Sequence, residues 1–297
     1  MTAPLPPGCR ERTIATATLK HMHLVEAGDP HAPLVVLLHG FPEFWYSWRH
    51  QLTALAAEFH VVAPDLRGYG GTEKPDTGYD ILTLAADINA LLAALTEGEL
   101  TRRPVTLVGH DWGGVVAWAT ASLHPARIDK LVAIDAPHLL AYLRSLKKAP
   151  GQVAKSWYIG MFQAPGFFEW LYRRDPQKMM TKMLMGAATR REVFTPEEIG
   201  HYVAAMADPK TLPCALAYYR ALPGALGHLD DLRAPVTAST LVLWGADDPA
   251  LGVDLIEACR SVVDAPFESQ VFADAGHWLQ QEKPQEVSAA IGAFAAR

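Results

Sequence analysis

The sequence predicts an α/β fold in which helices cover both faces of a mostly parallel, eight-stranded sheet and a helical cap is inserted between two strands. Short apolar runs alternate with amphipathic segments along most of the chain, which is typical of a parallel, helix-covered sheet. The run at 34–38 is apolar at every position, as expected of a strand buried on both faces. A stretch with no strand pattern, from 139 to 228, interrupts the alternation and predicts the cap.

In the first half of the chain we expect four strands and two helices. The strands fall at 13–19, 21–26, 34–38 and 61–64. The helix at 44–58 places Leu52 and Leu55 on one face. The helix at 80–96 begins at Asp80, whose side chain can accept from the free N–H groups of the first turn.

The second half supplies four more strands, the cap and a final helix. The strands fall at 105–108, 127–134, 240–244 and 268–272, and the final helix at 284–296. We therefore expect residues 1–138 and 229–297 to form the core and residues 139–228 to form the cap. Open α/β sheets bind ligands at the C-terminal ends of their strands, so the cap is expected to lie over those ends.

The composition limits the partners of the protein. Half of the 297 residues are hydrophobic, and the net charge is −6 with no basic cluster, so nucleic acid and membrane are poor partners. No apolar run approaches the roughly 20 residues of a membrane span, and the first residues contain no apolar signal core. Cys9, Cys214 and Cys259 are odd in number and far apart, which predicts no disulfide framework and a cytoplasmic location.

The sequence Gly-His-Asp-Trp-Gly at 109–113 has the spacing of a nucleophile elbow, with Asp111 where a serine is usual. The central residue of such a strand-to-helix turn is strained, so the residues two positions away must be small, as Gly109 and Gly113 are. Asp111 would stand at the N-terminus of a helix, where the dipole favours a carboxylate. Taken alone, Asp111 could also be a polar helix cap.

An aspartate nucleophile selects the type of reaction. A serine that attacked an alkyl carbon would form an ether, which the enzyme could not hydrolyse. Asp111 would form an ester, whose carbonyl carbon water can attack in a second step. The elbow therefore favours substitution at a saturated carbon, in an epoxide or an alkyl halide.

Motifs along nearly the whole chain resemble those of the epoxide hydrolases of the α/β-hydrolase fold family. They are His-Gly-Phe-Pro-Glu at 39–43, Asp-Leu-Arg-Gly-Tyr-Gly at 65–70, Gly-His-Asp-Trp-Gly-Gly at 109–114, Trp-Gly-Ala-Asp-Asp at 244–248 and Gly-His at 276–277. The resemblance implies conversion of a small, apolar epoxide and water to a vicinal diol, with no cofactor and no metal. It leaves open whether the protein is a monomer or a homodimer.

In this family the catalytic triad follows the chain order nucleophile, acid, histidine. His277 is the one histidine after the last predicted strand, so it is the expected base that activates water. Asp247 and Asp248 follow the strand before it, and the resemblance favours Asp248 as the acid. Asp135, at the end of an earlier strand, is the alternative acid because some relatives place theirs there.

The resemblance also implies how the epoxide oxygen is held. Two cap tyrosines, matched here by Tyr158 and Tyr219, hydrogen-bond that oxygen and protonate it as the ring opens. The backbone N–H groups of Phe41 and Trp112 are placed to form an oxyanion hole. The residues expected to contact the substrate are Trp112, Phe41, Phe162 and Met161.

Two other functions are compatible with part of this pattern. A haloalkane or haloacid dehalogenase uses the same nucleophile, but it must stabilise a halide rather than protonate an oxygen. The pair Tyr158 and Tyr219 argues against it, as does Phe41 where haloalkane dehalogenases often carry Asn. A non-catalytic ligand-binding protein of the same fold is disfavoured because no triad position has been lost.

Overall fold

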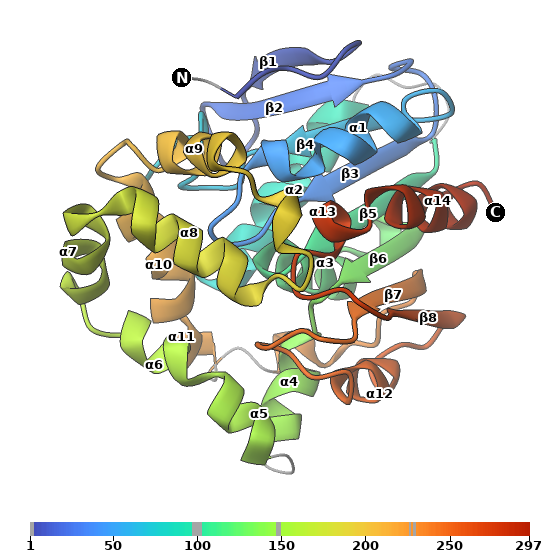
Figure 1. Cartoon of the computed structure of the whole chain (residues 1–297). Coiled ribbons are helices and arrows are strands. Elements are labelled where there is room, and N and C mark those ends of the chain that lie inside the picture. The colour runs from blue at the N-terminus through green and yellow to red at the C-terminus, as the bar shows by residue number, and fades with distance from the viewer. Residues whose placement is uncertain (1–2, 97–102, 147–149, 226, 228–229) are drawn as a thin grey trace.

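The computed structural model describes residues 3–96, 103–146, 150–225, 227 and 230–297. Its centre is an eight-stranded sheet in the order β1-β2-β4-β3-β5-β6-β7-β8 (Figure 1). β2 pairs antiparallel with both β1 and β4, and the strands from β3 to β8 run parallel. The predicted eight-stranded, mostly parallel sheet is confirmed.

The strands are β1 Arg10–Ile14, β2 Met22–Ala27, β3 Leu34–Leu38, β4 His60–Pro64, β5 Val105–His110, β6 Lys130–Ile134, β7 Ser239–Gly245 and β8 Phe267–Phe272. The prediction of a first strand at 13–19 was wrong at both ends. β1 is an edge strand with mostly exposed side chains, so it has no apolar pattern to mark it. Residues 16–19 instead form a turn in which the Thr16 hydroxyl accepts the N–H of Leu19 at 3.0 Å.

Helices of the core cover both faces of the sheet, with α1 and α14 in front of it and α2 and α3 behind it in the view of Figure 1. They are α1 Arg49–Leu55, α2 Ile81–Thr96, α3 Trp112–Leu123, α12 Leu255–Arg260, α13 Leu279–Glu282 and α14 Pro284–Ala295. The predicted helix at 44–58 is a 3₁₀ turn, Trp45–Trp48, followed by α1. The Asp80 carboxylate accepts the N–H of Thr83 at 3.0 Å, which confirms the predicted cap of α2.

The described residues between β6 and β7 form helices and contain no strand. The helices are α4 Leu139–Leu146, α5 Pro150–Lys155, α6 Trp157–Phe162, α7 Phe167–Arg174, α8 Pro176–Ala187, α9 Pro196–Ala205, α10 Thr211–Arg220 and α11 Leu222–Ala225. Pro176 and Pro196 each open a helix, where the missing N–H of proline costs nothing. We call this segment the helical insertion. The division of the chain into core and cap at 138 and 229 stays a prediction, and residues 228–229 lie outside the described residues.

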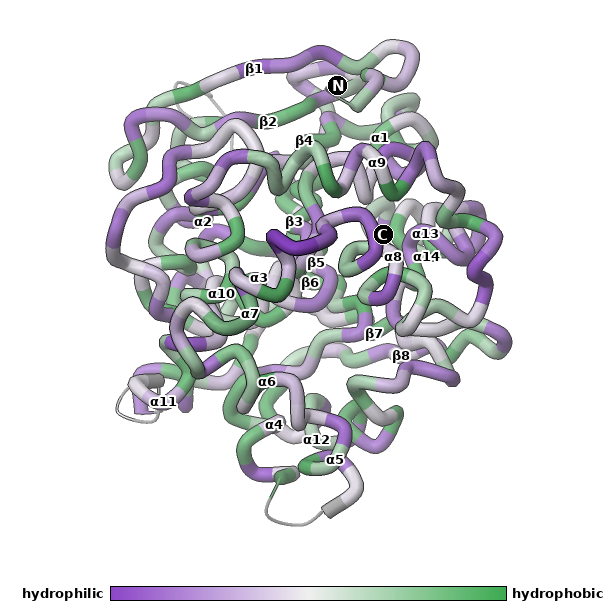
Figure 2. The backbone as a smooth tube through the Cα atoms, turned by 60° about the vertical axis from the view of Figure 1, so that its left-hand side comes forward, coloured by the Kyte–Doolittle hydropathy of each residue, from purple (hydrophilic) through white to green (hydrophobic). Residues whose placement is uncertain are grey.

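The core lies on both sides of the central strands. Every residue of β3 and of β5 is buried. Figure 2 shows hydrophilic colour on β1, at the edge of the sheet. In the part of the chain that the structure describes, no helix combines the length and apolarity needed to cross a bilayer.

Candidate active site

Asp111 occupies a strained turn between β5 and α3, with φ +49° and ψ −122°. A Cβ atom added to Gly109 would lie 2.3 Å from the carbonyl oxygen of Gly113, and one added to Gly113 would lie 2.2 Å from that of Leu38. No side chain fits at either position. The turn therefore has the geometry of the predicted elbow, and it presents the Asp111 side chain beyond the end of the strand.

The two oxygens of the Asp111 carboxylate face different groups. Oδ1 accepts the backbone N–H of Phe41 at 2.8 Å, whereas Oδ2 lies 3.6 Å from Nε2 of His277. Burial alone would raise the pKa of Asp111. The hydrogen bond and charge of His277, the charge of His110 and the Phe41 N–H outweigh burial and lower the pKa below its ordinary value. Asp111 is therefore a carboxylate at neutral pH.

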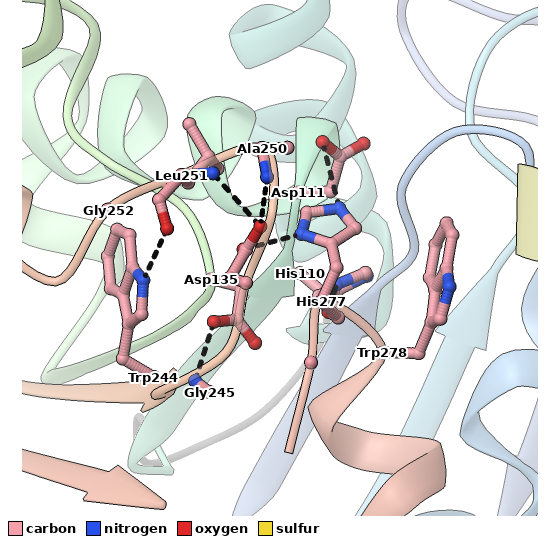
Figure 3. Close-up of polar contacts among 12 residues, drawn as sticks. His110, Asp111, Asp135, Trp244, Gly245, Ala250, Leu251, Gly252, His277 and Trp278 are labelled. Carbon is pink, nitrogen blue, oxygen red and sulfur yellow. Dashed lines mark hydrogen bonds and ion pairs between the residues drawn. The ribbon is translucent and has the colours of Figure 1, made fainter. Parts of the chain in front are cut away.

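His277 lies between the carboxylates of Asp111 and Asp248, and Figure 3 shows the dashed contact from its ring to Asp111. Its Nδ1 is 2.8 Å from Oδ2 of Asp248, and the other Asp248 oxygen accepts the N–H groups of Ala250 and Leu251 at 2.7 and 2.9 Å. Burial would lower the pKa of His277, but Asp248 and Asp111 together raise it well above the ordinary value. The imidazole therefore faces Asp111 through Nε2 and Asp248 through Nδ1.

Asp135 lies close by but turns away from the imidazole. Its Oδ1 accepts the N–H of Gly245 at 2.8 Å, and its buried Oδ2 has no hydrogen-bond partner among the described residues. Burial, followed by the charge of Asp248, raises the pKa of Asp135 well above its ordinary value. Burial therefore favours the protonated form of Asp135 more than it does for an exposed carboxyl. Asp247, the third acid considered, is exposed.

The helical insertion brings Tyr158 of α6 and Tyr219 of α10 over Asp111. Their ring centroids are 6.1 Å apart, and both rings line the same cavities as Asp111. Burial, reinforced by the charge of Asp111, raises the pKa of each tyrosine well above its ordinary value. Both phenols therefore keep their protons and can donate hydrogen bonds.

Asp111 borders a cavity of about 470 Å³ between the insertion and the core. It is lined by Phe41, Pro42, Asp111, Lys155, Trp157, Tyr158, Met161, Phe162, Phe168, Met179, Lys182, Met183, Gly186, Ala187, Tyr219, Pro249, Ala250, His277 and Trp278. Three of the four predicted substrate contacts, Phe41, Met161 and Phe162, line it. Trp112 instead borders a smaller cavity of about 60 Å³ that shares Asp111 and both tyrosines.

Two parts of this site were not among the predicted site residues, although the methionines of the insertion were expected to form part of the pocket wall. The first is the wall from α8, which includes Met179 and Met183. Residues 179, 182, 183 and 186 have helical spacing, and this was the available signal.

The second is a buried network behind His277. His110 approaches the carboxylate of Glu43 through Nδ1 and the carbonyl oxygen of His277 through Nε2, each at 2.7 Å. Glu43 also accepts from Gly40, Gln280 and Gln281. These contacts tie the loop that carries the base to the elbow and to the loop of Phe41.

Comparison with known proteins gives consistent results. A sequence profile of the family described as alpha/beta hydrolase fold matches residues 33–284. Epoxide hydrolase 4 of Mus musculus is 36% identical over 92% of this chain and 75% of its own length, and epoxide hydrolase A of Mycobacterium tuberculosis is 34% identical over 96% of each. The crystal structure of epoxide hydrolase A from Mycobacterium thermoresistibile superposes with a TM-score of 0.84, at 34% identity over 96% of this chain and 98% of the other.

Proposed function

The chain belongs to the α/β hydrolase fold family and is an epoxide hydrolase, and from that premise we propose that Asp111 is the nucleophile that opens the epoxide. One observation carries the proposal: an ionised carboxylate and two neutral phenols, Tyr158 and Tyr219, border the same cavity. A carboxylate can attack the carbon of an epoxide while a phenol supplies the proton that the leaving oxygen needs. A halide leaving group would need no such proton.

In the first step, Oδ2 of Asp111 attacks an epoxide carbon. A carbon–oxygen ester bond forms, the ring carbon–oxygen bond breaks, and its electron pair stays on the former epoxide oxygen. Tyr158 or Tyr219 gives that oxygen a proton. We assign the attack to Oδ2 because Oδ1 is held by the Phe41 N–H at 2.8 Å, and Oδ1 then becomes the carbonyl oxygen of the ester.

The first step prepares the base for the second. The charge of Asp111 helps to raise the pKa of His277, and ester formation removes that charge. His277 then loses its proton, which restores the phenol, and becomes able to accept a proton from water. Asp248 holds the imidazole through Nδ1 at 2.8 Å, so that Nε2 faces the ester.

In the second step water attacks Cγ of the Asp111 ester. The negative charge develops on Oδ1, where the Phe41 N–H already lies, and we assign the second donor to the backbone N–H of Trp112. Cleavage of the ester bond releases the diol with a proton from His277. The new carboxyl of Asp111, with one oxygen that came from water, gives its remaining proton to His277, and both groups return to their starting states.

The cavity wall between these groups is apolar and aromatic, as in Met161, Phe162 and Phe168, which favours an epoxide with an apolar substituent. A cytoplasmic location is proposed on the three free cysteines, of which Cys214 and Cys259 are buried. A monomer or a homodimer is proposed as the working form.

A single turnover in isotopically labelled water tests the mechanism across a panel of epoxides. We expect the label in Asp111 and unlabelled oxygen in the diol, since the diol receives the original Asp111 oxygen. Label that entered the diol directly would show that water attacks the epoxide without an ester intermediate. Halide release from a matched haloalkane panel, without diol from any epoxide, would overturn the reaction class.

A further inference from the structure

The cavity above Asp111 has a buried end and an exposed end. At the buried end, Tyr219 is 4% exposed and His277 is 5% exposed. At the other end Trp157 is 68% exposed, and the side chains of Lys155 and Lys182 are exposed as well. The exposed end is therefore the mouth through which a substrate enters, and its two charged residues are both lysines.

Lys182 belongs to the cavity wall and not to the outer surface of its helix. Met179, Lys182, Met183 and Gly186 of α8 all line the cavity, and their spacing of three and four residues places them on one helical face. Lys182 thus interrupts an otherwise apolar wall with a cation. In the described parts of the chain, no carboxylate lies within ion-pair distance of its ammonium group.

Lys155 reaches the mouth from a different helix. It ends α5, and its Nζ donates to the backbone carbonyl oxygen of Asp248 at 3.1 Å. An ammonium group has three donors, and this contact uses one of them. Among the described residues that line the cavity, Asp111 is the single carboxylate, so nothing acidic at the mouth neutralises the two lysines.

The charge of the surrounding helices has the same sign. Residues 139–191 contain ten Lys or Arg against two Asp or Glu, a net charge of +8 within a chain of net charge −6. One of the two acids, Glu169, is paired with Arg220 at 2.8 Å. This stretch is therefore basic although the chain as a whole is acidic. A positive field at the mouth attracts anions.

On the basis of the proposed function, we propose that the substrate is an epoxide whose apolar chain ends in an anionic group, a carboxylate or a phosphate. The epoxide lies at Asp111, the chain follows Met161, Met179 and Met183, and the anion lies between Lys155 and Lys182. The reverse orientation would bring the anion beside the Asp111 carboxylate, where like charges repel. The lysines thereby fix which end of the substrate reaches the nucleophile.

The test compares kcat/KM for three epoxides that share one chain and end in a carboxylate, a phosphate monoester or a neutral methyl ester. We expect the wild-type protein to prefer an anion over the ester by up to about fivefold at low salt, since an exposed ion pair contributes up to about that factor. The preference should shrink at high ionic strength. The anion with the higher kcat/KM shows whether the charged end of the substrate is a carboxylate or a phosphate.

Two charge reversals on the same helix locate the effect. Lys182→Glu should reverse the preference in favour of the ester. Lys178→Glu makes the same change on an exposed residue of α8 that does not line the cavity, and it should change the preference much less than Lys182→Glu does. The inference would be overturned if the methyl ester were turned over as well as both anions at low salt. It would also be overturned if Lys182→Glu and Lys178→Glu changed the preference equally. In either case, formation of the diol would still uphold the proposed function. Absence of diol from all three compounds would overturn the proposed function itself.

Discussion

The Nε2 atom of His110 lies 2.7 Å from the backbone carbonyl oxygen of His277. A carbonyl oxygen can only accept, so this nitrogen carries a proton. The other ring nitrogen lies 2.7 Å from the carboxylate of Glu43. Burial would raise the pKa of Glu43, but the charge and hydrogen bond of His110 outweigh it and hold the pKa below the ordinary value. The two side chains therefore form a buried contact that supports the backbone of the proposed base.

Glu43→Gln should lower the free energy of unfolding by about 3–5 kcal/mol, because it removes the carboxylate of the buried Glu43–His110 pair. Denaturant unfolding measures this loss. Glu11→Gln is the matched control, since Glu11 is 55% exposed and contacts His23 at 2.9 Å, and it should cost less than about 1 kcal/mol. Equal losses in the two variants would contradict the buried ion pair.

The same pair predicts how stability depends on pH. The pKa of Glu43 is lower in the folded protein than in the unfolded chain, so its contribution is present above the unfolded value of about 4.3. That contribution is lost as the pH falls through the folded pKa. Wild-type protein should therefore lose more stability on acidification than Glu43→Gln does.

His277→Gln should trap the ester on Asp111. Glutamine cannot accept a proton from water, whereas ring opening needs only the carboxylate and the tyrosines. Mass spectrometry of the intact variant after exposure to an epoxide should show a gain equal to the mass of that epoxide. The double variant with Asp111→Asn is the control. An adduct that persists in the double variant would place the covalent bond elsewhere.

Asp248→Asn and Asp135→Asn distinguish the two candidate acids by activity. Asp248 is hydrogen-bonded to Nδ1 of His277 at 2.8 Å, so its replacement should slow diol formation by on the order of a thousandfold or more. Asp135 accepts from the backbone N–H of Gly245, and asparagine has nearly the same shape. Its variant should keep its rate within a few-fold. The opposite ranking would make Asp135 the acid.

Asp135→Asn should also gain stability relative to the wild type as the pH rises. The pKa of Asp135 is raised on folding, so its favourable contribution is complete below the unfolded value of about 3.9 and is lost as the pH rises toward the folded pKa. Asparagine carries no charge at any of these pH values. It also tolerates the φ of +43° at this position. Urea unfolding from about pH 5 to about pH 8 should show a widening difference, and a constant difference would contradict it.

Local sequence was sufficient to predict the elbow but not the choice of acid. The constraints on Asp111 come from Gly109 and Gly113, which lie two positions away and are visible in the sequence. Asp135 and Asp248 both follow neighbouring parallel strands, in which Ile134 is paired with Leu243. Which of the two meets the imidazole depends on the direction of the side chain, and Asp135 is directed to the N–H of Gly245 while Asp248 is directed to His277.

Long-range partners explain what the sequence could not predict. Glu43 finds its partners at His110, Gln280 and Gln281, up to 238 positions away. The α8 wall shows the helical spacing of its residues, but an amphipathic helix packs in the same way against a core or around a cavity. The sequence therefore predicted the chemistry at Asp111. It did not predict the shape of the pocket, because that shape depends on tertiary packing.

The pair Tyr158 and Tyr219 provides the last prediction. Each phenol keeps its proton because its pKa is raised well above the ordinary value, and both border the cavity at Asp111. One phenol can still protonate the epoxide oxygen when the other is lost, so each single Phe variant should slow ring opening and the double variant should stop it. Rapid-quench measurement of the Asp111 ester follows this step directly.

The neighbouring Tyr218 supplies the control. Its hydroxyl donates to the backbone carbonyl oxygen of Arg67 at 2.8 Å and does not line the cavity, so Tyr218→Phe should open the ring at the wild-type rate. Because the pKa of both Tyr158 and Tyr219 lies well above 10, ring opening should also show no alkaline loss below about pH 10. A double Phe variant that opens the epoxide at the wild-type rate would remove both tyrosines from the mechanism and leave water as the proton donor.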